Sequence, residues 1–490
     1  MMAYRAPDRK KPHAPIAEKM AAYAADGALA FHTPGHKQGK GAHEALRKLI
    51  TAEGLREEVS LMEELDDIHS PSGCIKEAEE LAARLYGAKA AYFMVNGTSG
   101  AIHTMLLAAL SPGDTVLVQR NAHRSVYSAL VLLGARPIYL APEVDERLGI
   151  AHGVAPATIV RAIQRHPEAK AAVLVNPTYY GITTELDEIA EHLHNKGRLL
   201  LVDEAHGPHL AFCDRLPQDA IAAGADMAAQ STHKILGAMT QGSLLLANGD
   251  HVDYARIRET TGILTTTSPN QLLLASIDIA RLQMEESGRK AIERAAALAE
   301  KLRQDINKIP GLWSPGKDDF SRAGAVGLDL TKVTVNLAGL TITAIEAEEI
   351  LRHSYKVQCE LSDPENLLFI LSYADSEKET AVLLAALKDL AQKYLGKEKE
   401  PCAAVIPPLP KTKMSPREAF FAERESVSVK EAAGRIAAEE ITCYPPGIPA
   451  LVPGDVVTEE VLTYLEHMRK FGRRTIGARD ADFEKIVVVK

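Results

Sequence analysis

Cysteine and long apolar stretches are both scarce in this chain of 490 residues. No CxxC pair and no Cys/His metal-ligand spacing occurs among the five cysteines, which are Cys74, Cys213, Cys359, Cys402 and Cys443. We therefore expect no disulfide framework and no metal site, and a reducing, cytoplasmic location fits best. No run of about 18 apolar residues is present, and no apolar segment follows the basic start of the chain. Neither a membrane span nor a secretory signal is expected.

An excess of basic residues is also lacking. The formal net charge is −9 and the lysines and arginines are scattered, which argues against a nucleic-acid surface. A small cationic molecule is an easier partner for such a protein. The length, together with a hydrophobic content of 46%, is enough for a large core divided over two or three domains.

What the chain does have is a regular alternation of short apolar runs and amphipathic segments between residues 88 and 246. The runs are AAYFMV, TVLV, PIYL, AAVLV, LLLV, MAAQ and GSLLLA. Alternation of this kind predicts an α/β domain with a mostly parallel sheet that helices cover on both faces. Sheets of this type bind ligands at the carboxyl ends of their strands.

The rest of the chain predicts further domains. After Ser268, apolar spacing of three and four indicates one or two long helices, and TKVTVNLAGL and LLFILSY indicate strands. LGKEKEPCAA is typical of a linker, and the prolines and glycines of YPPGIPALVPG favour extended or turning backbone. The expected units are an N-terminal segment (1–40), a large domain (41–285), a small α+β domain (286–396) and a C-terminal domain (397–490).

The first candidate motif lies between a predicted strand and a predicted helix. It contains Gly97, Thr98, Ser99 and Gly100 within VNGTSGAIHTM. Small residues let the backbone approach an anion, and the amides and dipole at a helix start supply positive potential. Phosphate binding is one interpretation of the motif, and the geometry of an ordinary strand-to-helix turn is the other.

A histidine follows the next predicted strand. His123, in VQRNAHRSVY, stands where its imidazole can stack on a flat cofactor ring or take part in proton transfer. A lone histidine in this position is also commonly a surface or capping residue.

An aspartate ends the very apolar run LLLVDEAHG. A buried carboxylate such as Asp203 needs a partner, because ionised groups are costly to bury alone. A helix start or an arginine would serve. So would a protonated pyridine nitrogen, whose ring could then accept electrons from a substrate.

A lysine follows the strand MAAQ in STHKILG. Lys234 can form a Schiff base with an aldehyde, and a pocket of low polarity lowers the pKa of such an amine. Ser231 and His233 stand close enough to hold a phosphate. An anion-binding turn, a stacking histidine, an aspartate and a lysine, in this order, together predict a pyridoxal-phosphate (PLP) enzyme.

At these residues the chain resembles the Orn/Lys/Arg decarboxylases among the fold-type-I PLP enzymes, and specifically the short biosynthetic arginine decarboxylases of Gram-positive bacteria. The resemblance runs nearly end to end. Its motifs are FHTPGHKQGKG, DDIHSPSGCIKEAEELAARLYGA, NGTSGAIHTM, NPTYYG, VDEAHG, STHK, ILTTTSPNQLLLASIDIAR and CELSDPENLLFI.

The resemblance implies a role for each matching residue. Lys234 would bind the cofactor aldehyde, Asp203 would contact the pyridine nitrogen, and His123 would stack on the ring. Ala205 would pack on the ring, and His206 would lie near the cofactor or substrate, although longer relatives have tryptophan there. The residues implied in phosphate binding are Thr98, Ser99, Ser231 and His233.

Two further sites follow from the resemblance. Glu360 would bind the cationic tail of the substrate, for which two parallel hydrogen bonds to a guanidinium are possible. Thr265 and Thr266 are expected to reach the phosphate of a neighbouring subunit, because active sites of this fold lie at a subunit interface. Since the chain lacks the N-terminal wing domain of larger relatives, we expect a homodimer or a dimer-based oligomer.

The expected reaction is decarboxylation of arginine to agmatine and CO2, a step of polyamine biosynthesis. Lysine and ornithine remain alternative substrates. Aldol cleavage or transamination would use the same lysine, aspartate and phosphate turn, and the fold does not decide between these reactions. A PLP-binding module without enzymatic activity is a third hypothesis, which the intact Lys234 and Asp203 oppose.

Overall fold

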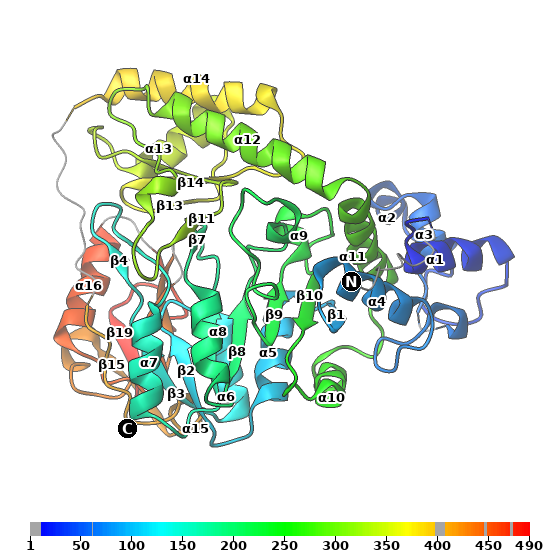
Figure 1. Cartoon of the computed structure of the whole chain (residues 1–490), viewed down its shortest axis with the longest axis horizontal. Helices are drawn as coiled ribbons and strands as arrows, with labels where there is room; N and C mark the ends of the chain where they lie inside the picture. The colour runs from blue at the N-terminus through cyan, green and yellow to red at the C-terminus, as the bar shows by residue number, and fades with distance from the viewer. Residues whose placement is uncertain (1–10, 61, 397–406, 445–447, 471–473) are drawn as a thin grey trace, which may run out of the picture.

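A seven-stranded sheet forms the centre of the large domain. In the computed structural model, which describes residues 11–60, 62–396, 407–444, 448–470 and 474–490, the strand order is β1-β10-β9-β8-β6-β2-β3 (Figure 1). The strands are β1 (Ala90–Met94), β2 (Thr115–Gln119), β3 (Arg136–Leu140), β6 (Ala171–Val175), β8 (Leu199–Asp203), β9 (Met227–Gln230) and β10 (Ser243–Ala247). Each coincides with one of the seven apolar runs, so this part of the sequence prediction is confirmed.

The pairing within this sheet is mostly parallel. β3, β2, β6, β8 and β9 pair in parallel, whereas β10 pairs antiparallel with both β9 and β1. β1 therefore has the same direction as the parallel strands. The carboxyl ends of all strands except β10 meet at one edge, where ligand sites of such sheets form.

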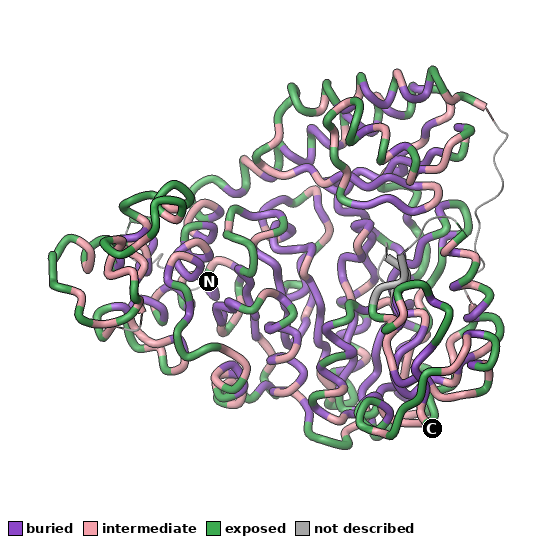
Figure 2. The backbone as a smooth tube through the Cα atoms, turned by 180° about the vertical axis from the view of Figure 1, so that it is seen from behind, coloured by how far each residue is buried: buried purple, intermediate pink, exposed green. Residues whose placement is uncertain are grey.

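Helices cover both faces of the sheet because its strands are apolar on both sides. Along β8, Leu200 and Val202 face one core and Leu201 faces the other. The first core includes residues of α1 (Pro15–Asp26), α4 (Cys74–Tyr86), α7 (Pro156–Arg165), α8 (Leu186–His194) and α11 (Gln271–Gln283). The second includes residues of α5 (Gly97–Ala109), α6 (Arg124–Leu133) and α10 (Tyr254–Leu264). Figure 2 shows this buried backbone in purple.

A smaller α+β unit lies beside the large domain. The chain enters it through a π-helical turn, Met284–Gly288, at which the helix axis changes direction between α11 and α12 (Figure 1). Its three antiparallel strands and three helices, all except β13, contribute to a separate apolar core. They are α12 (Arg289–Ile306), β12 (Lys332–Asn336), α13 (Ala344–Ile350), β13 (Leu361–Ser362), β14 (Asn366–Ile370) and α14 (Glu377–Tyr394).

The C-terminal unit has a core of its own and docks near β2 and β3 (Figure 1). It consists of α15 (Pro416–Phe421), β15 (Arg424–Ser428), β16 (Ile441–Tyr444), β17 (Ile448–Leu451), α16 (Glu459–Lys470), β18 (Arg474–Ile476) and β19 (Lys485–Val489). Most of the expected linker, 397–406, and part of the proline-rich segment, 445–447, lie outside the described residues. Within that segment, residues 448–451 form strand β17.

Short elements complete the fold. The N-terminal part adds α2 (Glu44–Leu49) and α3 (Ala52–Glu57), and α9 (Thr232–Ile235) follows β9. Two small antiparallel pairs are also present: the hairpin of β4 (Val144–Asp145) with β5 (Ile150–Ala151), and the long-range pair of β7 (Ile182–Thr183) with β11 (Gly327–Leu328).

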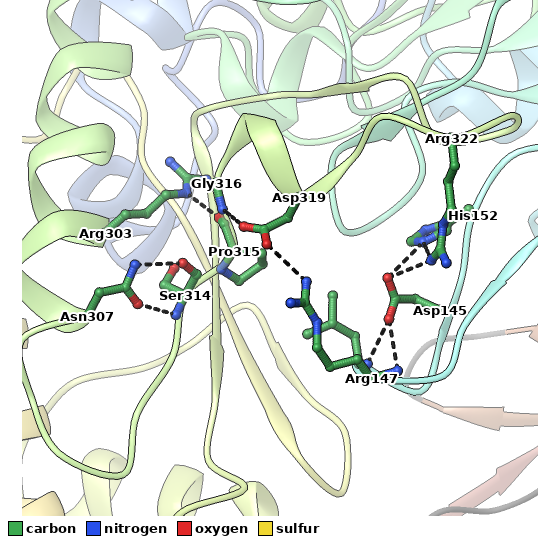
Figure 3. Close-up of polar contacts among 11 residues, drawn as sticks. Asp145, Arg147, His152, Arg303, Asn307, Ser314, Pro315, Gly316, Asp319 and Arg322 are labelled. Carbon is green, nitrogen blue, oxygen red and sulfur yellow. Dashed lines mark hydrogen bonds and ion pairs between the residues drawn. The ribbon is translucent and has the colours of Figure 1, made fainter.

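A polar cluster joins the β4–β5 hairpin to the segment that precedes β11 (Figure 3). Asp145 accepts a hydrogen bond of 2.6 Å from Arg322, and Arg147 pairs with Asp319 at 3.0 Å. The guanidinium of Arg147 also lies 3.8 Å from the ring centroid of Trp313. These contacts fix the small unit against the edge of the large domain on which the candidate site lies.

Candidate active site

A cavity of about 510 Å³ opens at the carboxyl edge of the central sheet. Its lining comes from the segments that follow β1, β2, β6, β8 and β9, and from β16 and the residues just before it. Ten of the site residues expected from the sequence line it, namely Gly97, Thr98, Ser99, His123, Asp203, Ala205, His206, Ser231, His233 and Lys234. Loops of parallel strands converge in this way because the strands end at the same edge.

Four expected residues do not line this cavity. A Cβ on Gly100 would meet that of Asn96 at 2.8 Å, so packing within the turn favours glycine at this position, and its role in cofactor binding stays a prediction. Thr265 ends α10, and Thr266 lies exposed with its carbonyl 3.1 Å from His69 Nε2. The role of both threonines in a neighbouring subunit stays a prediction. Glu360 reaches the site indirectly, since its carboxylate accepts a 2.7 Å hydrogen bond from the cavity residue Tyr179.

The turn before α5 has the features of an anion site. Gly97 has a φ of 69°, in the left-handed region that suits glycine, and it begins the helix. The Thr98 hydroxyl contacts those of Ser231 and Ser243, the latter at 2.8 Å. Three hydroxyls carry three hydrogens but need only two for their mutual bonds, so one hydrogen is left for an outside acceptor. Together with the helix start, this arrangement suits a phosphate.

His233 stands beside this turn and is oriented by the backbone. Its Nδ1 lies 2.9 Å from the carbonyl oxygen of Gly242. A carbonyl only accepts, so Nδ1 carries the hydrogen of this bond. Nε2 can then donate to an anion when the imidazole is protonated.

Asp203 is a buried carboxylate without a cation. It ends β8, and only 3% of its surface is exposed. Its side chain accepts a 3.1 Å hydrogen bond from the amide of Ala205, and no lysine, arginine or histidine in the described part of the chain forms an ion pair with it. A buried charge of this kind calls for a cationic partner inside the cavity.

Lys234 lines the cavity, and its side chain is exposed there. Nζ lies 3.0 Å from Nε2 of His206. Desolvation lowers the pKa of Lys234, and the negative charges of Asp203 and Glu360 oppose that shift. An amine with a lowered pKa is more often neutral, and a neutral amine is the form that attacks an aldehyde.

His123 caps the helix that follows it while facing the cavity. Its Nδ1 lies 2.8 Å from the Ser125 hydroxyl and accepts a 3.3 Å bond from the Ser125 amide at the start of α6. Desolvation lowers the pKa of His123, and Asp203 opposes this shift. The capping role and a role in the cavity are therefore compatible, because the capping bonds leave Nε2 and the ring face available.

The structure adds residues that the sequence motifs did not single out. Lys332, on β12 of the small unit, is fully buried with its Nζ 2.6 Å from Nδ1 of His206. The Tyr179 ring lies 4.5 Å from that of His206. Glu440 and Thr442, from the C-terminal unit, line the cavity opposite the sheet loops. Tyr179 belongs to the NPTYYG motif, which was its only sequence signal.

Two structural features are absent among the described residues. None of their helices combines the length and apolar character needed to cross a bilayer. No group of three or more His, Cys, Asp or Glu side chains within those ranges is arranged to hold a metal ion.

Comparison with known proteins gives consistent likenesses. The model of the Orn/Lys/Arg decarboxylase major domain matches residues 14–317, and that of the C-terminal domain of the same family matches residues 399–480. A protein of Halalkalibacterium halodurans named arginine decarboxylase is 41% identical over 97% of both chains. An arginine decarboxylase of Bacillus subtilis is 40% identical over 94% of both chains.

Solved structures agree on the fold. The crystal structure of the Francisella novicida lysine decarboxylase covers 98% of this chain and 81% of its own, with a TM-score of 0.85 and 25% identity. The fold of a Bacillus subtilis ureidoglycine-glyoxylate aminotransferase is shared over 65% of this chain and 84% of its own, with a TM-score of 0.52 and 16% identity. The fold class expected from the sequence is thereby confirmed.

Proposed function

The chain belongs to the Orn/Lys/Arg decarboxylase family, and on this premise we propose that it is a PLP-dependent enzyme that converts arginine to agmatine and CO2. One cavity contains both Lys234, whose amine is desolvated, and Asp203, a buried carboxylate that forms no ion pair with the described residues. Their presence in the same cavity is the observation that carries the proposal. Relatives that are about 40% identical and named arginine decarboxylase support arginine over lysine and ornithine.

The donor set of the cavity fits PLP. Lys234 would hold the aldehyde and Asp203 the protonated pyridine nitrogen, while the ring would lie against His123 and Ala205. Thr98, Ser99, Ser231 and His233 would hold the phosphate, for which the spare hydroxyl hydrogen is suited. When bound, PLP supplies an aldehyde that condenses with amines and a conjugated ring that accepts the electrons of the breaking carbon–carbon bond.

The protein's own residues orient the reactants and control charge. Asp203 would favour a positive ring nitrogen in bound PLP, because opposite charges attract strongly where water is excluded. Neutral Lys234 acts as a nucleophile and, once protonated, as a proton donor. His123 and His206 stay mainly neutral because burial lowers the pKa of both imidazoles.

Glu360 is the proposed contact for the cationic end of the substrate. Its hydrogen bond from Tyr179 orients the carboxylate beside the cavity. Burial lowers the pKa of Lys234 and of Lys332, and the same negative charge opposes the lowering at both amines. A carboxylate held in this way can accept two bonds from a guanidinium.

We further propose that the enzyme works in the cytoplasm, in polyamine biosynthesis, as a homodimer or a dimer-based oligomer. Free thiols at the buried Cys74 and Cys213 are in keeping with a reducing compartment. Thr265 and Thr266, which lie away from the cavity of their own chain, are available to a neighbouring subunit.

Release of labelled CO2 from arginine, lysine and ornithine tests the proposal. Arginine should react with the highest kcat/KM, and Lys234→Ala should abolish both turnover and borohydride-trapped PLP on the peptide that contains residue 234. Preference for lysine or ornithine would overturn the substrate assignment. Release of an aldehyde or a keto acid, without CO2, would overturn the reaction, and absence of turnover with PLP bound would favour a binding module.

A further inference from the structure

His206 lies between two lysine amines. Its Nε2 is 3.0 Å from Nζ of Lys234, and its Nδ1 is 2.6 Å from Nζ of Lys332. The three groups come from different parts of the chain, since His206 follows β8, Lys234 is in α9, and Lys332 begins β12 of the small unit. Both ring nitrogens are thus occupied by a group that is ordinarily an ammonium.

Hydrogen-bond accounting restricts the charges of this trio. A neutral imidazole has one N–H donor and one acceptor nitrogen, whereas an ammonium donates only. If Lys332 is charged, it donates to Nδ1, so Nε2 carries the hydrogen and Lys234 has to accept it as a neutral amine. If Lys234 is charged, it donates to Nε2, so Nδ1 carries the hydrogen and Lys332 has to accept it as a neutral amine. A doubly charged state would leave two donors facing each other.

The surroundings of Lys332 supply no full counter-charge. Its side chain is fully buried, and no carboxylate in the described ranges lies within ion-pair distance of it. The nearby Asp329 lies 3.1 Å from Nε2 of His209 and accepts a 2.7 Å hydrogen bond from the Thr331 hydroxyl. Burial lowers the pKa of Lys332 to about 7, with Asp329 and Glu360 opposing the shift and Lys234 adding to it.

The other charged groups around the trio belong to the cavity. Asp203 and Glu360 attract a proton to Lys234, and Glu360 is itself bonded to Tyr179. The imidazoles of His123 and His209 and the two lysines lower the pKa of His206, which burial lowers most. His206 therefore stays neutral, and the lysines are the two members of the trio that exchange charge.

Close packing fixes the stem of Lys332. Gly181, with a φ of 86°, lies so near that a Cβ there would meet Lys332 Cγ at 2.7 Å. The Lys332 amine also lies 5.8 Å from the Tyr179 ring centroid. A side chain held along its length keeps its amine on Nδ1 of His206, which a charge-sharing role requires.

We propose that Lys332 is a positioning residue that shares one proton with Lys234 through His206, so that only one of the two amines is charged at a time. In the transfer, Lys332 loses a proton to Nδ1 while Nε2 gives its proton to Lys234. His206 changes tautomer, and one positive charge moves from Lys332 to Lys234. The inference rests on the proposed function only in taking Lys234 as the reactive amine.

The test measures Lys234 in the chain without cofactor. The apoprotein is treated with an amine-acylating reagent at a series of pH values, and modification of the peptide that contains residue 234 is measured by mass spectrometry. In the wild type, the midpoint of the pH dependence of Lys234 modification should lie below the ordinary lysine pKa of about 10.4. Lys332→Met removes a positive charge and should move the midpoint up by about one pH unit or more. Lys89→Met, at an exposed lysine paired with Asp250, is the matched control and should leave it unchanged.

Two further measurements keep the test decisive. In a His206→Phe background, which removes both ring nitrogens, the shift caused by Lys332→Met should shrink. If Lys332→Met does not fold, a wild-type titration of ε-¹³C-lysine resonances should show one of the two amines neutral near pH 7. An unchanged midpoint in folded Lys332→Met, an equal shift without His206, or two charged amines near pH 7 would overturn the proposal. Each result is independent of decarboxylation, because neither PLP nor substrate is present.

Discussion

The ion pair between Arg120 and Asp455 should decide whether the C-terminal unit stays docked on the large domain. A nitrogen of Arg120, just after β2, lies 2.7 Å from an Asp455 oxygen, and the side chains are 4% and 0% exposed. The same guanidinium bonds the Ala450 carbonyl at 3.2 Å and lies 4.7 Å from the Tyr139 ring centroid. Asp455 also accepts from the Val452 amide. The ion pair is therefore buried where the two units meet.

Asp455→Asn removes the negative charge with little change in volume. The guanidinium of Arg120 then stays buried without compensation, which typically costs about 3–5 kcal/mol. Local opening of the C-terminal unit should become at least about 100-fold more frequent, since about 1.4 kcal/mol corresponds to a factor of ten. Because Glu440 and Thr442 of this unit line the cavity, decarboxylation should fall as well.

Hydrogen exchange measures this opening directly. The Ala437 amide donates to the Asp455 carbonyl and the Gly454 amide donates to the Ala437 carbonyl, so peptides with these amides report on opening of the unit around Asp455. The double variant Arg120→Met/Asp455→Leu should regain most of the lost protection, because apolar residues can replace a buried pair. Asp250→Asn, at an exposed pair with Lys89, should have no measurable effect. A loss of hydrogen-exchange protection of less than tenfold in Asp455→Asn would refute the reasoning. So would a double variant that is as little protected as the single one.

Three other predictions concern the cavity. Thr98→Val keeps the side-chain shape but removes the hydroxyl that joins Ser231 and Ser243, so PLP affinity, measured by absorbance titration, should weaken about 10- to 100-fold; unchanged affinity would contradict the phosphate site. Glu360→Gln should raise KM for arginine by about tenfold or more, whereas Glu349→Gln, on an exposed helix, should not; equal effects would exclude the tail contact. The pKa of Lys332 is about 7 in the folded chain, below the value of 10.5 in the unfolded chain. Between these two pH values the unfolded chain binds more protons, so the contribution of Lys332 to the free energy of unfolding rises with pH. The stability advantage of Lys332→Met over wild type, measured by denaturant unfolding, should therefore shrink from pH 7 to pH 10, and a constant difference would be evidence against a depressed pKa.

The central sheet could be predicted because its signal is local. Each apolar run, such as LLLV before Asp203, is long enough for one buried strand, and all seven runs became strands. Parallel strands end at one edge, so residues placed just after them, Asp203 and Lys234 among them, meet without any knowledge of long-range contacts. The family motifs added the pairing of these residues with a cofactor.

The remainder of the cavity depends on contacts between distant segments. Lys332 lies 126 residues from the histidine it contacts, in a strand whose apolar pattern marks it only as buried. Glu440 and Thr442 reach the cavity because the C-terminal unit docks there, and no local pattern encodes docking. Gly100 is ambiguous in a different way: its close approach to Asn96 accounts for the absence of a side chain, and a ligand contact at this glycine stays a prediction.

The π-helical turn between α11 and α12 has a mechanical consequence. Backbone hydrogen bonding continues from residue 271 to residue 306, so this connection offers no slack loop through which the two units could slide apart. Bulges of this type are points at which helices bend. The continuous helix therefore acts as a strut that, together with the polar contacts of Figure 3, sets the position of the small unit and of β12 over the carboxyl edge of the sheet.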